Sequence, residues 1–364
     1  MTTNSGILPS QAIRALIANG TIGLGSPVAE RQVQPASLDL RLGPVAFRIR
    51  ASFLPRRDQP IAKRLETLTL HRLDLTAGAV LETGCVYIVP LLERLSLPPS
   101  VAAATNPKSS TGRLDVFTRV IADGVPAFDL VPAGYSGPLY AEICPLTFPI
   151  VVRSGSTLSQ IRFRMGDARE PDEALAELQT SETLVAGGIV DIDGGIALSV
   201  DLTPDPAFGG LVGYRAKRHT GVVDVDQPAA CATEDYWEPI RLGPERPALI
   251  LDPDQFYILA SKEAVTIPPS HAAELMPFNP LVGEFRVHYA GFMDPGFGHR
   301  RAGGSGARVV LEVRSHSVPF VLEDGQIIGR LVYERMAEEP ERLYGADLAS
   351  HYQAQGLKLS KHFR

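Results

Sequence analysis

The stretch Leu97-Pro-Pro-Ser-Val-Ala-Ala103 decides the fold, because it occurs twice. It returns 170 residues later as Ile267-Pro-Pro-Ser-His-Ala-Ala273. The same offset aligns further pairs along the chain: Tyr87-Ile-Val89 with Tyr257-Ile-Leu259, Leu139-Tyr-Ala-Glu142 with Val309-Val-Leu-Glu312, and Ile161-Arg-Phe163 with Leu331-Val-Tyr333. A repeat at a fixed offset is the sequence signature of a duplicated structural unit. We therefore predict a tandem duplication, with the join near residues 166–185.

Each copy has the sequence pattern of β structure. The chain contains 30 prolines and 33 glycines, which separate short β-prone runs such as 37–42, 86–89 and 149–153. This spacing is typical of an all-β sandwich or barrel. Helices are predicted over residues 7–20, with Ser10 as the N-cap, and over the charged segment 167–184, which would bridge the two copies. The basic segment 56–64 is expected to be a solvated loop.

Composition sets limits on the partners. A length of 364 residues suits two domains, and a net charge of −6 argues against a general nucleic-acid binder. No apolar run is long enough to span a membrane, and the N-terminus lacks the pattern of a secretory signal, so we expect a cytoplasmic protein with no membrane partner. The three cysteines are far apart and odd in number, which predicts buried free thiols and no disulfide framework or metal site.

The segment Asn106-Pro-Lys-Ser-Ser-Thr-Gly-Arg-Leu114 is the candidate functional region. Lys108 precedes two hydroxyls, Ser109 and Ser110, and Arg113 follows within reach. Such donors suit phosphate oxygens, although a solvated turn would have the same composition. In the second copy the offset places Phe278, Asn279, Pro280 and Gly283 at the positions of Lys108, Ser109, Ser110 and Arg113. Because residues of the fold are retained there while anion-binding residues are not, the pattern favours a functional site in the first copy.

Several motifs resemble the dCTP deaminase and dUTPase superfamily. They are Pro107-Lys-Ser-Ser-Thr-Gly-Arg-Leu114, Gly134-Tyr-Ser-Gly137, the strand that carries Glu142, Met293-Asp-Pro-Gly-Phe-Gly298 in the second copy, and the tail formed by Tyr344 and His351-Tyr-Gln-Ala-Gln-Gly356. The chain is most similar to a long, duplicated form of dCTP deaminase. The resemblance implies a mainly β fold of two tandem dUTPase-like distorted β-barrel or jelly-roll (β-clip) domains, residues 1–170 and 186–364, with 171–185 as a linker.

The resemblance also implies an activity, the hydrolysis of dCTP to dUTP and ammonia, which supplies dUTP for dTTP synthesis. Zinc deaminases hold their metal with a His/Cys-x-Glu and Pro-Cys-x-x-Cys signature, which this sequence lacks, so we expect no zinc. In the family scheme Glu142 is the general base and acid, Arg113 balances its charge and orients it, and Ser109 serves the water. Two local cations are too few for a triphosphate, so Mg²⁺ is expected to arrive with the nucleotide.

The remaining site residues follow from the same resemblance. The expected substrate-binding residues are Lys108, Ser110, Asp129, Asp294, Tyr344, His351, Tyr352, Gln353 and Gln355, of which the last five belong to a lid over the triphosphate. The family's Asp for the deoxyribose 3′-hydroxyl has two candidates, Asp129 and Asp294. Family members are trimers with sites between subunits, so we expect a homo-oligomer, and a site that mixes residues of both copies stays open. Glu312 is expected to be a remnant of a site or an interface group.

Three functions remain open at this point. The leading one is dCTP deamination. The second is dUTP diphosphatase activity, alone or coupled to deamination, in which an Asp activates water at the α-phosphate. The third is nucleotide binding without turnover, because one copy lacks the anion-binding residues. The expected ligands are dCTP and dUTP, with dTTP as a further candidate, acting as an inhibitor.

Overall fold

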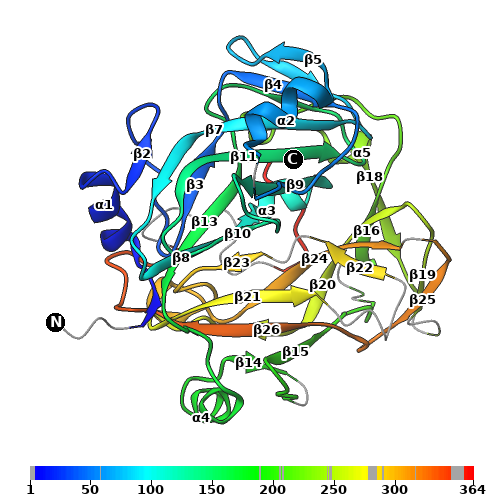
Figure 1. Cartoon of the computed structure of the whole chain (residues 1–364). Helices are drawn as coiled ribbons and strands as arrows, with labels where there is room; N and C mark the ends of the chain where they lie inside the picture. Colours follow the sequence, from blue (N-terminus) through cyan, green and yellow to red (C-terminus); the bar gives the residue numbers. More distant parts are fainter. Residues whose placement is uncertain are drawn as a thin grey trace.

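A computed structural model gives the fold of the chain. It describes residues 5–57, 59–187, 190–204, 206, 209–243, 245, 248–277, 285–288, 291–315, 317–345 and 356–364. Residues 5–170 are called the first half below, and residues 171–364 the second half. Figure 1 shows the first half, in blue to green, lying above most of the second half, in green to orange, with the C-terminal tail in red between them.

Two antiparallel sheets make up most of the first half, and a smaller sheet of order β17-β12-β6 adds one strand of the second half, β17, in parallel to β12. The first sheet has the order β5-β4-β7-β11-β9, with β2 also paired to β7, and the second has the order β1-β13-β8-β10, with β3 paired to β13. The strands are β1 (Gly6–Ile7), β2 (Ile22–Leu24), β3 (Leu38–Arg41), β4 (Val45–Ile49), β5 (Thr69–Asp74), β6 (Ala79–Leu81), β7 (Val86–Ser96), β8 (Val101–Pro107), β9 (Val116–Ala122), β10 (Leu130–Val131), β11 (Ser136–Pro145), β12 (Ile150–Val152) and β13 (Thr157–Met165). The runs predicted at 37–42, 86–89 and 149–153 are confirmed as strands.

The second half repeats these sheets. Its orders are β18-β16-β20-β24-β22, with β14 on β20, and β15-β26-β21-β23, with β19 paired to β25. The strands are β14 (Val185–Ala186), β15 (Ile196–Ser199), β16 (Leu211–Ala216), β17 (Val223–Asp224), β18 (Trp237–Arg241), β19 (Ala248–Leu251), β20 (Phe256–Val265), β21 (His271–Pro277), β22 (Phe285–His288), β23 (Phe292–Met293), β24 (Ala307–Ser315), β25 (Phe320–Glu323) and β26 (Ile327–Arg335). Strands that the 170-residue offset aligns, such as β7 and β20, occupy equivalent places in the two sets of sheets.

Helices are few in the described residues: α1 (Ser10–Ala18), α2 (Ile61–Leu68), α3 (Ser109–Gly112), α4 (Asp172–Glu182), α5 (Thr233–Tyr236) and the 3₁₀ turn η3 (Arg300–Ala302). Both predicted helices are confirmed, but the predicted cap is wrong, because Pro9 is the N-cap of α1 and no side chain caps it. The basic segment is a helix in part: Ile61 and Leu65 anchor α2 in a small apolar cluster, which overrides its charged sequence.

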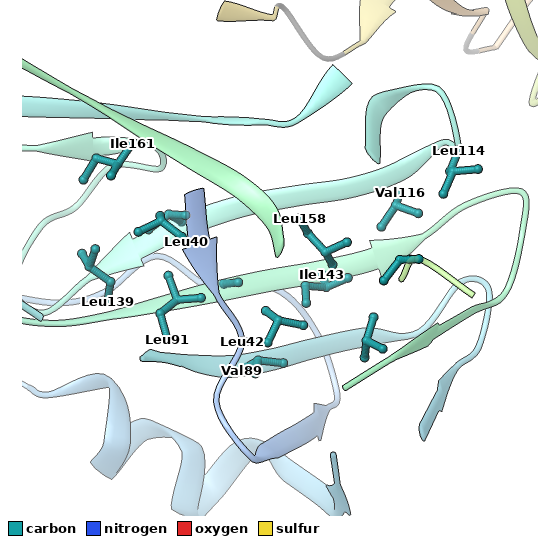
Figure 2. Close-up of a cluster of buried hydrophobic side chains, with 14 of the residues drawn as sticks. Leu40, Leu42, Val89, Leu91, Leu114, Val116, Leu139, Ile143, Leu158 and Ile161 are labelled. Carbon is teal, nitrogen blue, oxygen red and sulfur yellow. The ribbon is translucent and has the colours of Figure 1, made fainter. Parts of the chain in front are cut away.

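The apolar core of each half lies between its sheets. Figure 2 shows part of the first, in which Leu40, Leu42, Val89, Leu91 and Ile143 point toward one another from strands of both sheets. Burial of this surface is the main favourable contribution to folding. The halves are joined by aromatic rings of both, since Phe148 packs edge-on against Tyr236, Trp237 and Phe363 at centroid distances of 5.6, 5.4 and 6.1 Å.

The three cysteines are free thiols, as predicted, but the predicted burial holds only for Cys231, since Cys85 and Cys144 are partly exposed. In the described part of the chain, no helix has the length and apolar character needed to cross a membrane.

Candidate active site

The segment predicted to bind anions lies where the two halves meet. It leaves β8 of one sheet, forms the single turn α3 and enters the other sheet of the first half as β9. Backbone hydrogen bonds from Thr111 and Gly112 to the carbonyl of Lys108 close the turn, at 2.8 and 3.0 Å. Figure 1 places α3 between the sheets of the first half and strands β23 and β24 of the second. The short turn therefore presents its side chains to the other half of the chain.

Arg113 reaches a carboxylate of the second half. Its Nε lies 3.8 Å from Oε1 of Glu312, and both side chains are almost fully buried. Its Nη1 donates a 3.0 Å hydrogen bond to the carbonyl of Lys358 in the tail. Burial raises the pKa of Glu312 to about 8, although the Arg113 guanidinium acts to lower it. A carboxyl group that titrates near neutral pH can both accept and return a proton.

Glu142 has a different partner. Its Oε1 accepts hydrogen bonds from Nε and Nη2 of Arg119, at 3.2 and 2.5 Å. Arg119 comes from the neighbouring strand β9, where it lies opposite Glu142 in the register. Its guanidinium also lies over the rings of Phe117 and Phe128, at 4.6 and 3.4 Å from their centroids. The expected pairing of Arg113 with Glu142 is therefore replaced by two separate pairs, Arg113 with Glu312 and Arg119 with Glu142.

The two candidate aspartates, Asp129 and Asp294, also belong to two separate groups of residues. Asp294 is buried and accepts a 3.3 Å hydrogen bond from Nη2 of Arg162, a first-half residue on β13. Burial raises its pKa to about 6, Arg162 lowers it, and the nearby charge of Asp39 raises it further. Asp39 in turn forms an ion pair with Lys108. Asp294 thus lies close to the anion-binding segment of the other half.

Asp129 belongs instead to the Glu142 group. It accepts hydrogen bonds from the Thr105 hydroxyl at 2.7 Å and from the Val120 backbone N–H at 2.8 Å. Burial raises its pKa to about 6. The charge of Arg119 lowers this pKa, and the charge of Glu142 raises it. Asp129 and Glu142 therefore form one cluster with Arg119, while Asp294 and Glu312 lie at the segment that carries Lys108 and Arg113.

The remaining predicted residues fall in three places. Ser109 is half-buried and Ser110 is buried, and the Ser110 carbonyl accepts a 2.9 Å hydrogen bond from the hydroxyl of Ser360. The Tyr344 ring packs on Phe297 at 5.7 Å, just beyond Asp294 in the same loop region. His351, Tyr352, Gln353 and Gln355 lie outside the described residues.

Sequence reasoning missed three functional candidates: Asp39, Arg162 and Lys361. Asp39 and Arg162 are charged residues within buried β strands, where an ionic group needs a partner, and that pattern could have drawn attention to them. Lys361 lies beyond the tail motif and carries no local signal. Within the described residues, no group of three or more His, Cys, Asp or Glu side chains is placed to hold a metal ion.

The raised pKa of Glu312 makes a prediction about stability. The unfolded chain releases this proton near pH 4.5, whereas the folded chain keeps it up to about pH 8. Between these values the folded state binds more protons, so stability falls as pH rises. Because glutamine does not titrate, Glu312→Gln should remove this loss of unfolding free energy, which amounts to at most about a few kcal/mol at pH 8. Urea unfolding at pH 5 and pH 8 checks it, and an equal pH dependence in both proteins would contradict the assignment.

Comparisons with known proteins place both halves of the chain in one family. The family model for the 2'-deoxycytidine 5'-triphosphate deaminase N-terminal domain matches residues 4–167, and that for the C-terminal domain matches residues 171–363. A crystal structure of 2'-deoxycytidine 5'-triphosphate deaminase from Agrobacterium tumefaciens is 58% identical, with a TM-score of 0.89, over 93% of this chain and 100% of that one.

Two curated relatives carry the name "dCTP deaminase, dUMP-forming". The protein of Coprothermobacter proteolyticus is 28% identical over 44% of this chain and 82% of its own length. That of Beutenbergia cavernae is 31% identical over 43% of this chain and 78% of its own length. Both family models together span nearly all of the sequence. The chain belongs to the dCTP deaminase family.

Proposed function

We propose that the chain hydrolyses dCTP to dUTP and ammonia at a site formed between its two halves. The observation that carries this proposal is the buried carboxyl of Glu312, which has a raised pKa and lies against Arg113 of the anion-binding segment. The first half supplies cations and hydroxyls, and the second half supplies two carboxyl groups. The cations beside Glu312 and Asp294 therefore come from the other half of the chain.

In this proposal Glu312 takes the role that the sequence assigned to Glu142. A water molecule adds to C4 of the cytosine ring and gives a proton to the Glu312 carboxylate. Glu312 returns that proton to the amino group, the bond between C4 and this nitrogen breaks and ammonia leaves. The second proton of the water passes from the C4 hydroxyl to N3, so that C4 becomes a carbonyl. Arg113 holds the carboxylate in place and offsets its charge. Proton transfer of this kind contributes about 10²- to 10⁴-fold to a rate.

The other residues bind the nucleotide. We assign Ser109 to the water and Lys108 and Ser110 to phosphate oxygens, because they lie on the segment that bears Arg113. Asp294 is the candidate for the deoxyribose 3′-hydroxyl, since it lies beside Asp39 and Lys108, whereas Asp129 is engaged in the other cluster. The tail residues 344–355 keep their proposed role as a lid.

Mg²⁺ is proposed to bind with the triphosphate rather than to a resident protein site. Phosphate oxygens and water satisfy most of its preferred coordination, and the chain lacks the zinc deaminase sequence signature. Zinc is therefore not part of the proposal. A chelator should stop the reaction only until Mg²⁺ is added back.

We also propose that each half is a dUTPase-like distorted β-barrel, residues 1–170 and 186–364, with 171–185 as the link. The matching sheet orders of the two halves support this. The contact between halves then takes the place of a contact between subunits, and each chain carries one complete site. Assembly into a trimer, a cytoplasmic location and inhibition by dTTP stay predictions.

A second candidate function is the further release of diphosphate to give dUMP, because the two curated relatives are named for that product. One experiment tests both functions. The protein is incubated with dCTP and Mg²⁺, and ammonia, dUTP, dUMP and diphosphate are quantified. We expect ammonia and dUTP in equal amounts. Ammonia together with dUMP and diphosphate, in place of dUTP, would support the second function, and binding of dCTP without release of ammonia would contradict both.

A further inference from the structure

The last residues of the chain are fixed against the anion-binding segment. Arg113 and Ser110 of that segment contact Lys358 and Ser360 of the tail through the two hydrogen bonds described above. The backbone N–H groups of Ala229 and Cys231 donate to the carbonyls of Lys361 and His362, at 2.9 and 3.0 Å. The ring of Phe363 completes the aromatic cluster between the halves. Residues 358–363 are therefore part of the wall of the site.

A small polar cavity of about 140 Å³ lies between the tail and the segment. Its polar lining consists of Ser110, Thr111, Thr157, Asp226, Lys361 and His362. The Asp226 charge is partly offset, because this carboxylate accepts hydrogen bonds from the Ser156 hydroxyl at 2.6 Å and from Arg153 at 3.4 Å. The cavity has room for several water molecules, and hence for one phosphate group.

Two lysines approach this cavity from opposite halves. Lys108 donates a 2.9 Å hydrogen bond to the hydroxyl of Thr157, which lines the cavity, and Lys361 lines it directly. Burial lowers the pKa of Lys361, and the positive charge of Lys108 lowers it further, whereas the carboxylates of Asp39 and Asp226 act to raise it. Asp39 is paired with Lys108. A phosphate group that enters the cavity would add an interaction with both ammonium groups and with the hydroxyls beside them.

We propose that Lys361 is a phosphate-binding residue, which together with Lys108 and the hydroxyls of this cavity holds one phosphate group of the nucleotide. The inference rests on the proposed function for the identity of the nucleotide. It adds a residue from beyond the tail motif and makes the C-terminus part of the substrate site. It also gives the chain a means to select dCTP over deoxycytidine, which has no phosphate to place there.

The test uses binding of inorganic tripolyphosphate and of dCTP, measured by isothermal titration calorimetry. Hydrogen bonds to charged groups contribute about 1.5–3 kcal/mol, so Lys361→Met should weaken both ligands about 10- to 100-fold. In turnover assays the same variant should raise KM for dCTP and leave kcat within a few-fold. Lys361→Arg keeps the charge and should bind within a few-fold of the wild type, which also controls for misfolding. Lys63→Met, on exposed α2, is the matched control and should change neither ligand.

The outcomes separate this inference from the proposed function. Wild-type affinity for tripolyphosphate in Lys361→Met, or the same loss in Lys63→Met, would overturn the inference. Tripolyphosphate binding that depends on Lys361 in a protein that releases no ammonia would support the inference and contradict the proposed function. Deamination by a protein that does not bind tripolyphosphate would support the proposed function and contradict the inference.

Discussion

Glu312→Gln is expected to lower dCTP deamination by about 10²- to 10⁴-fold, whereas Glu142→Gln is expected to keep most of the activity. The substitution preserves shape and removes the group that carries the proton. Glu312 is buried beside Arg113, which belongs to the anion-binding segment. Glu142 has one oxygen held by Arg119, and its other oxygen, Oε2, is buried with no hydrogen-bond partner among the described residues.

The two variants control each other. They make the same chemical change at positions related by the 170-residue offset, on β11 and β24. Ammonia release is the activity readout, and calorimetric binding of dCTP shows that Glu312→Gln still holds its ligand. Loss of ammonia release in Glu142→Gln with full activity in Glu312→Gln would assign the role to Glu142 and reject the site between the halves.

Arg119 explains why Glu142, one of the two glutamates related by the 170-residue offset, is not available to a nucleotide. Its guanidinium lies between Phe117 and Phe128 and donates to Glu142 and to the hydroxyl of Ser52. In the second half the carboxylate instead receives its cation, Arg113, from the other half. The charge of Glu142 is therefore balanced by a cation of its own half, Arg119. This is consistent with a single nucleotide site in each chain.

Much of the fold could be predicted from the sequence, because a duplication shows itself as a fixed offset. The strand pattern, the bridging helix and the cations of residues 108–113 were all visible as local signals. The helix α2 was missed because its eight residues hold only two buried apolar anchors, Ile61 and Leu65, among charged neighbours. A periodicity that short is easily taken for a loop.

The partner of Arg113 could not be read from the sequence. Glu142 and Glu312 occupy equivalent positions on equivalent strands, so local pattern gives no reason to prefer the more distant one. The choice is made by packing between the halves, where Arg162 contacts Asp294 and Asn106 donates to Glu274 at 3.1 Å. Such contacts join residues more than 130 positions apart. The charged residue Arg119 within β9 was the one local sign in the sequence that Glu142 has its cation in the same half.

Arg162→Met is expected to destabilise the protein by about 3–5 kcal/mol, the usual cost of removing one partner of a buried ion pair. The side chain is 2% exposed. It donates to the carbonyls of Ala273 and Met293, both at 3.1 Å, and to carboxylates of the second half. Its guanidinium also lies 4.1 Å from the centroid of the Phe292 ring. Methionine replaces the aliphatic part but leaves these acceptors buried without their donor.

The pH dependence of this loss distinguishes a charge effect from a packing effect. The pKa of Asp294 is about 6 with Arg162 in place, and Arg162 is one of the groups that lower it. Without Arg162 this pKa must rise further, so the variant should lose most stability at pH 8 and less at pH 5, where Asp294 is protonated in both proteins. Urea unfolding at the two pH values measures the difference. Arg164→Met, two residues along β13 and half-buried, is the control, with an expected change below about 1 kcal/mol. A loss in Arg162→Met that is equal at both pH values would mean that Arg162 joins the halves by packing, and not by holding the charge of Asp294 at the site.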